Sequence, residues 1–190
     1  MDWKDINIKT FDKMRNIPES LSDIERTKRI IEILFDIPDA YAIPTMEFGK
    51  YIDELAGLNK EMKEYKPRHK YELNGRKYEL AWAIENWTVA QYIDFITMIR
   101  NNDSYSRILA CVLIPKGKKY NTDYDIEKAY EDISELNIEE AKSIYRYYFR
   151  LLPSFIDNFR HYLTKLNMEA ATKEKIIETL EILSQRTRTE

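Results

Sequence analysis

Residues 71–99, YELNGRKYELAWAIENWTVAQYIDFITMI, are the one part of this chain in which the spacing of apolar residues changes its period. Apolar residues alternate on both sides of the Asn74-Gly75 dipeptide, and after Trp87 they recur at helical spacing, as they do in most of the chain. Asn74 and Gly75 both tolerate positive φ, which a two-residue type I′ turn needs at its two central positions. The stretch therefore predicts a β-hairpin over about residues 69–82, followed by a helix.

The predicted turn also sets the register of the hairpin. It places two opposite-charge pairs and one aromatic pair on adjacent rungs, and each pair is worth roughly 0.2–1 kcal/mol of stability. These cross-strand pairs are Glu72 with Lys77, Tyr71 with Tyr78, and Lys70 with Glu79. A two-stranded hairpin is only marginally stable alone in water, so it must pack against other elements.

The helix after the hairpin carries its own start signal. Thr88 and Gln91 have the spacing of a capping box, and Trp87 and Tyr92 occupy the positions of a hydrophobic staple. Trp82 and Trp87 lie between the hairpin and the helix, so we expect them to form a hinge of the core. The alternative is that the two indoles form a stacking site for a ligand.

Helical spacing dominates the rest of the chain and predicts a mostly α fold of the α+β class. Capping patterns at Ser22 and Asn137 mark the starts of two of the helices. The polar loop PKGKKYNTDYD is the best internal boundary, and it separates an N-terminal region, 1–115, from a C-terminal region, 116–190, that we expect to share its core. The expected helices cover about residues 10–17, 23–35, 45–65, 88–99, 104–114, 125–136, 138–166 and 169–185.

The longest periodic segment lies in the C-terminal region. From Ile138 to Leu166 its apolar residues step by three and four, which is the pattern of a helix packed along another helix. Pro153 lies inside this segment and should kink the helix or split it in two. We therefore expect long C-terminal helices with a buried seam.

Composition argues against several classes of protein. The chain has 190 residues, of which 44% are hydrophobic and 33% charged, so it can bury the core of one sizeable domain. Its net charge of −3 provides no general attraction to nucleic acid or to an anionic membrane, and no apolar run approaches the length of a membrane span. We therefore expect a soluble protein made in a cytoplasm, with no membrane partner and with nucleic acid as a disfavoured one. Its single cysteine, Cys111, lies in the apolar run RILACVLI and is expected in the core.

Few residues are available for catalysis or metal binding. Neither His69 nor His161 has a second histidine at zinc-ligand spacing, and the phosphate-loop, nucleophile-elbow and dinucleotide-binding motifs are missing. Residues 121–132 have a partial calcium-loop pattern, but Ile126 stands where the turn needs glycine, so we interpret these carboxylates as the start of a helix. We expect a protein that is not an enzyme, with no metal and no cofactor.

Two basic segments are candidates for contact with phosphate groups. One leads into the hairpin and the other follows Pro115. They support the alternative of a nucleic-acid-binding regulator, although the acidic balance of the whole chain argues against it. The candidate residues are Lys66, Arg68, Lys70, Lys116, Lys118 and Lys119.

Aromatic residues are abundant, with 14 tyrosines, 7 phenylalanines and 3 tryptophans. Tyrosine, tryptophan and arginine are the residues that anchor protein–protein interfaces, although a well-filled core would account for the same composition. We expect a protein that works through protein–protein contacts. The candidate interface residues are Asn74, Gly75, Arg76 and Lys77 at the hairpin tip, and Tyr145, Tyr147, Tyr148 and Phe149 on the long helix.

The hairpin and the helix after it also carry a family resemblance. YELNGRKYEL at 71–80, followed by WTVAQYIDF at 87–95, resembles small proteins encoded among the structural genes of tailed bacteriophages. These include tail-assembly-chaperone-like proteins and the neck and tail components of crAss-like phages. The resemblance covers about residues 5–100 and includes no catalytic residue.

The resemblance implies a role in virion architecture. It implies a non-enzymatic structural protein of the portal–tail connector, neck or tail ring, located in the virion, with copies of itself and other virion proteins as partners. The alternative is a tail-assembly chaperone, which would bind tail proteins during construction and be absent from the mature particle.

Overall fold

The predicted hairpin is present, as the first part of a three-stranded antiparallel sheet. In the computed structural model, which describes residues 1–165 and residue 174, β1 (Lys70–Leu73) pairs with β2 (Arg76–Leu80) in the predicted register. Asn74 and Gly75 have φ angles of 48° and 73°. The left-handed backbone that the turn requires is therefore supplied by the two residues that tolerate it best.

A third strand replaces the end of a predicted helix. The helix expected at 104–114 is shorter, because α5 spans Tyr105–Ala110 and Leu113–Pro115 then forms β3, which pairs antiparallel with β2. The apolar residues of β3 favour an extended strand once β2 is available as a partner. Since β3 lies at the edge of the sheet, Pro115 removes no hydrogen bond from the ladder.

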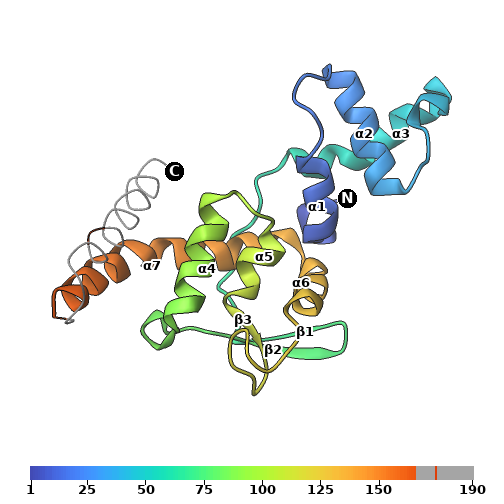
Figure 1. Cartoon of the computed structure of the whole chain (residues 1–190). Coiled ribbons are helices and arrows are strands. Elements are labelled where there is room, and N and C mark those ends of the chain that lie inside the picture. Colours follow the sequence, from blue (N-terminus) through green and yellow to red (C-terminus); the bar gives the residue numbers. More distant parts are fainter. Residues whose placement is uncertain (166–173, 175–190) are drawn as a thin grey trace.

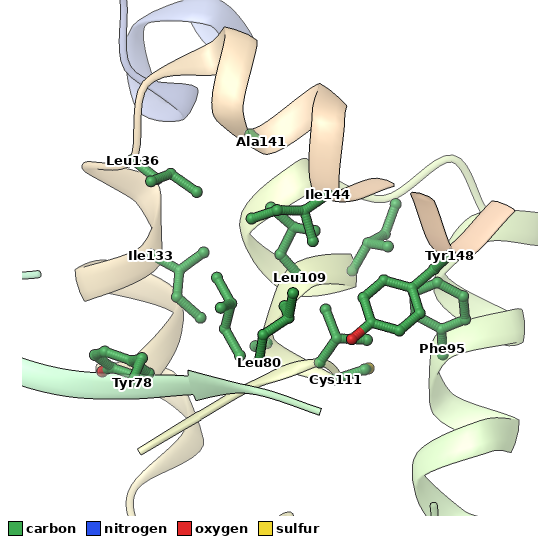
Figure 2. Packing of buried hydrophobic residues seen from close by; sticks show 14 of the residues in the cluster. Tyr78, Leu80, Phe95, Leu109, Cys111, Ile133, Leu136, Ala141, Ile144 and Tyr148 are labelled. Carbon is green, nitrogen blue, oxygen red and sulfur yellow. The ribbon is translucent and has the colours of Figure 1, made fainter. Parts of the chain in front are cut away.

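One face of the sheet forms the floor of the core. Tyr71, Leu73, Tyr78 and Leu80 are buried on this face and alternate along the strands with charged residues. The helices α5, α6 (Ile126–Ser134) and α7 (Ile138–Lys165) lie over it (Figure 1). Figure 2 shows side chains of β2, α5, α6 and α7 meeting in one cluster. This cluster contains residues from both sides of residue 115. The domain boundary expected at that residue stays a prediction.

α5 is buried along most of its length. Ile108, Leu109 and Ala110 are buried within it, and Cys111 follows directly with no exposed surface, as expected for a core cysteine. The Cys111 Sγ atom lies 3.6 Å from the Tyr120 hydroxyl oxygen, and burial raises the pKa of the thiol to about 12.

We expect Cys111 to resist alkylation in the folded protein. An exposed cysteine has a pKa of about 8.5, so at pH 9 the folded chain holds far less thiolate than the unfolded chain, and iodoacetamide should react at least about 100-fold more slowly with it. Because the folded pKa is the higher one, the contribution of this thiol to stability is complete below about pH 8.5 and is lost as the pH rises towards about 12. Mass spectrometry of native and denatured samples over time measures both rates, and equal rates would contradict the buried position.

The helix α4 (Val89–Arg100) begins at the predicted cap, but its capping box is incomplete. The Thr88 hydroxyl oxygen accepts a hydrogen bond from the Gln91 amide at 3.1 Å, as the spacing predicts. The buried Gln91 side chain turns away from the cap, and its Nε2 donates to the Cys111 carbonyl at 2.6 Å. Gln91 therefore ties α4 to the chain entering β3, which supplies a buried carbonyl with a donor.

The long helix α7 starts at the predicted Asn137 cap, whose Oδ1 accepts from the Glu140 amide at 2.9 Å. It continues through Pro153, so the proline does not split it. The predicted seam is present in its first half, where Ile144 is buried and Tyr145 is half-buried. The buried residues are Ile138, Ala141, Ile144, Tyr148 and Leu152. The seam side chains after Pro153 and the helix expected at 169–185 lie outside the described residues.

The N-terminal helices begin at caps, one of which was predicted. α1 (Ile8–Arg15) starts at Asn7 rather than at Thr10, and Asn7 Oδ1 accepts from the Thr10 amide at 2.9 Å. α2 (Asp23–Phe35) starts with the predicted capping box of Ser22 and Glu25. Short 3-10 turns complete the chain: η1 (Trp3–Asp5), η2 (Ala40–Ala42), η3 (Ala56–Asn59) and η4 (Ile84–Asn86).

A segment without regular structure replaces half of the helix predicted at 45–65. α3 ends early, spanning Thr45–Leu55, and residues 60–68, here called the strap, cross α7. The Lys63 amide donates to Glu139 Oε1 and the Tyr65 amide donates to Ser143 Oγ, both at 2.9 Å. These long-range bonds to α7 outweigh the helix propensity of the lysine, glutamate and methionine residues in this segment.

Residues 23–59, here called the helical lobe, stand apart from the sheet. In Figure 1, α2 and α3 project at the upper right, and α1 lies between them and the helices that cover the sheet. Of the hydrophobic side chains in the lobe, only those of Ile31 and Ala40 are buried. The lobe therefore contributes little to the core and presents much of its apolar surface outward.

Candidate functional site

The hairpin tip is held by a buried carboxylate. Asp132 of α6 has no exposed surface and accepts hydrogen bonds from the Tyr78 hydroxyl at 2.7 Å and from Asn74 Nδ2 at 3.1 Å. Arg76 Nη1 lies 3.4 Å from the same carboxylate. Burial, together with the neighbouring Asp132, raises the pKa of the Tyr78 hydroxyl, which therefore stays a donor at neutral pH. Two of the predicted interface residues, Asn74 and Arg76, thus serve the fold.

Tyr148 is a core residue and not part of a surface. Its side chain is fully buried, its hydroxyl donates to the Ala81 carbonyl at 2.7 Å, and its ring contacts that of Trp87. The Tyr148 ring also contacts that of Phe95 (Figure 2). No partner can reach Tyr148 without unfolding α7 from the core. Its inclusion among the interface residues is therefore corrected.

The neighbouring Tyr147 is half-buried and packs within the chain. Its ring meets that of Trp82 edge to face at 5.1 Å between centroids. Trp82 makes a second edge-to-face contact with His69 at 5.4 Å, and Trp87 packs on Phe95. The two tryptophans therefore fill the hinge between hairpin and α4, as expected, and they also line a hollow of about 650 Å³.

The other two predicted residues of α7 line a basic and aromatic hollow of about 450 Å³, here called the α7 hollow. The Tyr145 and Phe149 rings stack at 5.4 Å between centroids. Arg150 forms a bidentate pair with Glu64 of the strap, with a shorter bond of 2.7 Å, and Arg146 lies 3.7 Å from the same carboxylate. The full lining is Tyr105, Lys142, Tyr145, Arg146, Phe149, Arg150 and Pro153.

Sequence reasoning did not include the basic side chains of the α7 hollow among the interface residues. Lys142, Arg146 and Arg150 are four residues apart, and Tyr145 and Phe149 follow the same spacing, so helical periodicity places each group along one line of the surface. Burial, with a smaller contribution from Arg146, lowers the pKa of Lys142. Arginine beside stacked tyrosine and phenylalanine is a residue set that anchors protein interfaces.

The helical lobe exposes large apolar side chains. Met46, at the start of α3, is 91% exposed, and Ile24, at the start of α2, is 68% exposed. Lys28 lies one turn after Ile24, and its Nζ is 3.8 Å from the centroid of the exposed Tyr41 ring. Such exposure away from the core is typical of a surface that binds a partner.

The two predicted basic segments lie next to each other on the outer side of the sheet. The Lys116 amide donates to the Lys77 carbonyl at 2.8 Å, which joins the segment after β3 to the hairpin. Arg68, Lys70, Lys77 and Lys116 line a common hollow of about 370 Å³. Lys118 and Lys119 line a neighbouring one, whereas Lys66 lies in the strap, outside the lining of either.

The calcium-like pattern of residues 121–132 is dispersed by the fold. Asp125 caps α6, its Oδ1 accepting from the Glu127 and Lys128 amides at 3.0 and 3.2 Å, and Asp132 is in the core. The interpretation as a helix start is confirmed. Within the described part of the chain, no three histidine, cysteine or carboxylate residues are grouped to hold a metal ion. The side chain of His161 lies outside the described residues.

The fold is thus a mostly helical α+β fold with one small sheet. The chain matches no protein-family model, no curated protein and no solved structure. Among the described helices, none combines the length and the apolar character needed to cross a membrane.

Proposed function

We propose that this chain is a non-enzymatic assembly protein that associates head to tail with copies of itself. One observation carries the proposal: the helical lobe exposes Ile24, Tyr41, Met46 and Ile52, four of the seven large hydrophobic residues that are exposed among those described. A surface of this kind is stabilised when a partner covers it.

The α7 hollow is the surface on this chain that complements the lobe. The lobe carries eight carboxylates against four basic side chains, so it is acidic as well as apolar. The hollow offers stacked aromatic rings flanked by Lys142, Arg146 and Arg150, whose three positive charges exceed the single negative charge of their neighbour Glu64. Opposite charge around apolar contacts favours association and fixes its orientation.

Two different surfaces on one chain produce a heterologous contact, which closes into a ring or continues as a filament. A ring is the architecture expected of the phage connector and tail proteins that residues 5–100 resemble. The proposed setting is therefore the portal–tail connector, neck or tail ring of a tailed-phage virion, with other virion proteins as further partners.

Light scattering of wild type and Met46→Glu tests the contact. We expect wild type to form a species of several 22.8-kDa chains and Met46→Glu to be monomeric, because the new carboxylate would enter an apolar contact and cost several-fold to 100-fold in affinity. Ile93→Glu is the matched control, since Ile93 lies on α4, outside the lobe, and is 55% exposed. It should assemble like wild type. The idea of a lobe contact fails if the two variants behave alike.

Mixing two assembly-deficient variants tests the head-to-tail geometry. Met46→Glu keeps an intact α7 hollow, and Arg146→Glu/Arg150→Glu keeps an intact lobe; the two arginines are exposed, so the fold should tolerate their loss. Each variant alone should be monomeric, and the mixture should give heterodimers, because one working contact remains between them. A mixture that stays monomeric contradicts the pairing of these two surfaces.

A monomeric wild type would exclude self-association. Mass spectrometry of purified virions would then separate the remaining roles. Presence in the particle would indicate a subunit that closes only on other virion proteins, and absence would indicate the tail-assembly chaperone.

A further inference from the structure

The pairing of β2 with β3 brings together lysines that are about forty residues apart in the chain. Lys70 and Lys77 come from the hairpin, and Lys116 follows β3. The Lys116 amide donates a hydrogen bond to the Lys77 carbonyl. Together with Arg68 they line a hollow of about 370 Å³. The packing of the core does not require this grouping, because these side chains lie on the outer side of the sheet and are exposed.

A second hollow, of about 650 Å³, continues from the first. Glu79 lines both, which makes them neighbours along the sheet. Lys118 and Lys119 line the second hollow beside Trp82 and Trp87, and His69 is also in its wall. We call the two hollows together the basic track.

The charge of the basic track is opposite to that of the chain. Six basic side chains face two carboxylates, Glu72 and Glu79, in a chain whose net charge is −3. Arg68 is paired with Glu140 of α7 at 2.8 Å. Among the described residues, no carboxylate lies within ion-pair distance of the five lysines, Lys70, Lys77, Lys116, Lys118 and Lys119. Like charges repel one another, and Glu72 and Glu79 on the neighbouring rungs offset only part of this repulsion, so a bound anion would stabilise the grouping.

We propose that the basic track binds single-stranded nucleic acid. Its phosphates would lie along the five lysines, and a base would enter the second hollow against Trp82 and Trp87, because indole rings stack on unpaired bases of any sequence. A volume of about 650 Å³ lies in the range of small-ligand pockets and can hold a base with its sugar. A duplex keeps its bases stacked inside the helix, so it would contact the lysines without filling this hollow.

Fluorescence polarisation with labelled oligothymidylate and oligouridylate tests the track. We expect binding that weakens with salt, with a slope of log K against log salt of about −3 to −4 for five lysine contacts. Lys116→Glu/Lys118→Glu/Lys119→Glu should lose at least about 10-fold in affinity, and its slope should fall by about 2. Lys4→Glu/Lys9→Glu/Lys13→Glu is the matched control, with the same change of net charge at exposed lysines away from the sheet, and should lose much less.

The ligand class is tested by competition. Single strands should displace the probe better than a duplex of equal length or inorganic polyphosphate, and they should quench tryptophan fluorescence. Equal displacement by polyphosphate, or equal losses in the two triple variants, would overturn the proposal, as would no binding at low salt. A preference for oligouridylate over oligothymidylate would identify RNA as the ligand. The lysines of the basic track lie outside the lobe and the α7 hollow. Lys116→Glu/Lys118→Glu/Lys119→Glu should therefore assemble like wild type in light scattering, so a loss of nucleic-acid binding can be told apart from a loss of head-to-tail assembly.

Discussion

Replacing Tyr148 with alanine is expected to lower the free energy of unfolding by about 3–5 kcal/mol. The side chain is fully buried, contacts the rings of Trp87 and Phe95, and donates a hydrogen bond to the Ala81 carbonyl. Truncation would leave a large cavity at the junction of α7 and α4 that these rings cannot fill. Since domains of this size are stable by about 5–15 kcal/mol, denaturant unfolding followed by circular dichroism will resolve the loss.

Two companion variants separate packing from hydrogen bonding and from assembly. Tyr148→Phe should cost only about 1 kcal/mol, because the Ala81 carbonyl keeps a second donor, Trp87 Nε1 at 3.2 Å. Tyr145→Ala, at a half-buried position in the α7 hollow, should cost less stability than Tyr148→Ala and should weaken assembly. A Tyr148→Ala protein with native stability that fails to assemble would restore Tyr148 to the interface.

Replacing Asp132 with alanine is the second change with a large expected effect, about 2–4 kcal/mol. The Asp132 carboxylate accepts from the Tyr78 hydroxyl and from Asn74 Nδ2, and its loss would leave the buried Tyr78 hydroxyl without that acceptor. The hairpin tip would also lose its connection to α6. Chemical denaturation measures the loss, and faster hydrogen exchange at the β1 and β2 amides would locate it.

A double-mutant cycle identifies the cause. Tyr78→Phe alone should cost about 1–2 kcal/mol, and Asp132→Leu combined with Tyr78→Phe should recover part of the loss, because removing both partners leaves no buried group unpaired while the exposed Asn74 and Arg76 side chains can bond to water. Arg76→Ala should cost at most about 1 kcal/mol, since half of that side chain is exposed. Additive losses for Asp132 and Tyr78 would show that the hydrogen bond between them contributes little.

Features set by neighbouring residues could be predicted well. The register of β1 and β2 follows from the Asn74-Gly75 turn, and helix starts at Ser22, Thr88 and Asn137 follow from side chains that reach amides three residues away. Each of these depends on interactions within a few residues, which the order of amino acids specifies directly.

Competition between local and distant partners could not be predicted. Residues 113–115 and the strap both have helical spacing, yet one pairs with β2 and the other hydrogen-bonds to α7. Gln91 has the spacing of a capping box but donates to the Cys111 carbonyl. In each case the segment forms hydrogen bonds to a partner distant in the chain in place of the local ones that its spacing predicts. The spacing of residues along the chain does not indicate which distant segment will lie close by.

The candidate surfaces divide in the same way. The amino-acid sequence alone was enough to show an α-rich chain built on one hairpin, with arginine and tyrosine concentrated on the long helix and lysine in two segments. Helical spacing had already placed Tyr148 in the buried seam, whereas only the tertiary structure left the helical lobe uncovered and brought Lys77 next to Lys116. The physical reason is that burial and charge proximity are properties of the packed chain, because they depend on which distant segments exclude water from a side chain or bring their charges beside it.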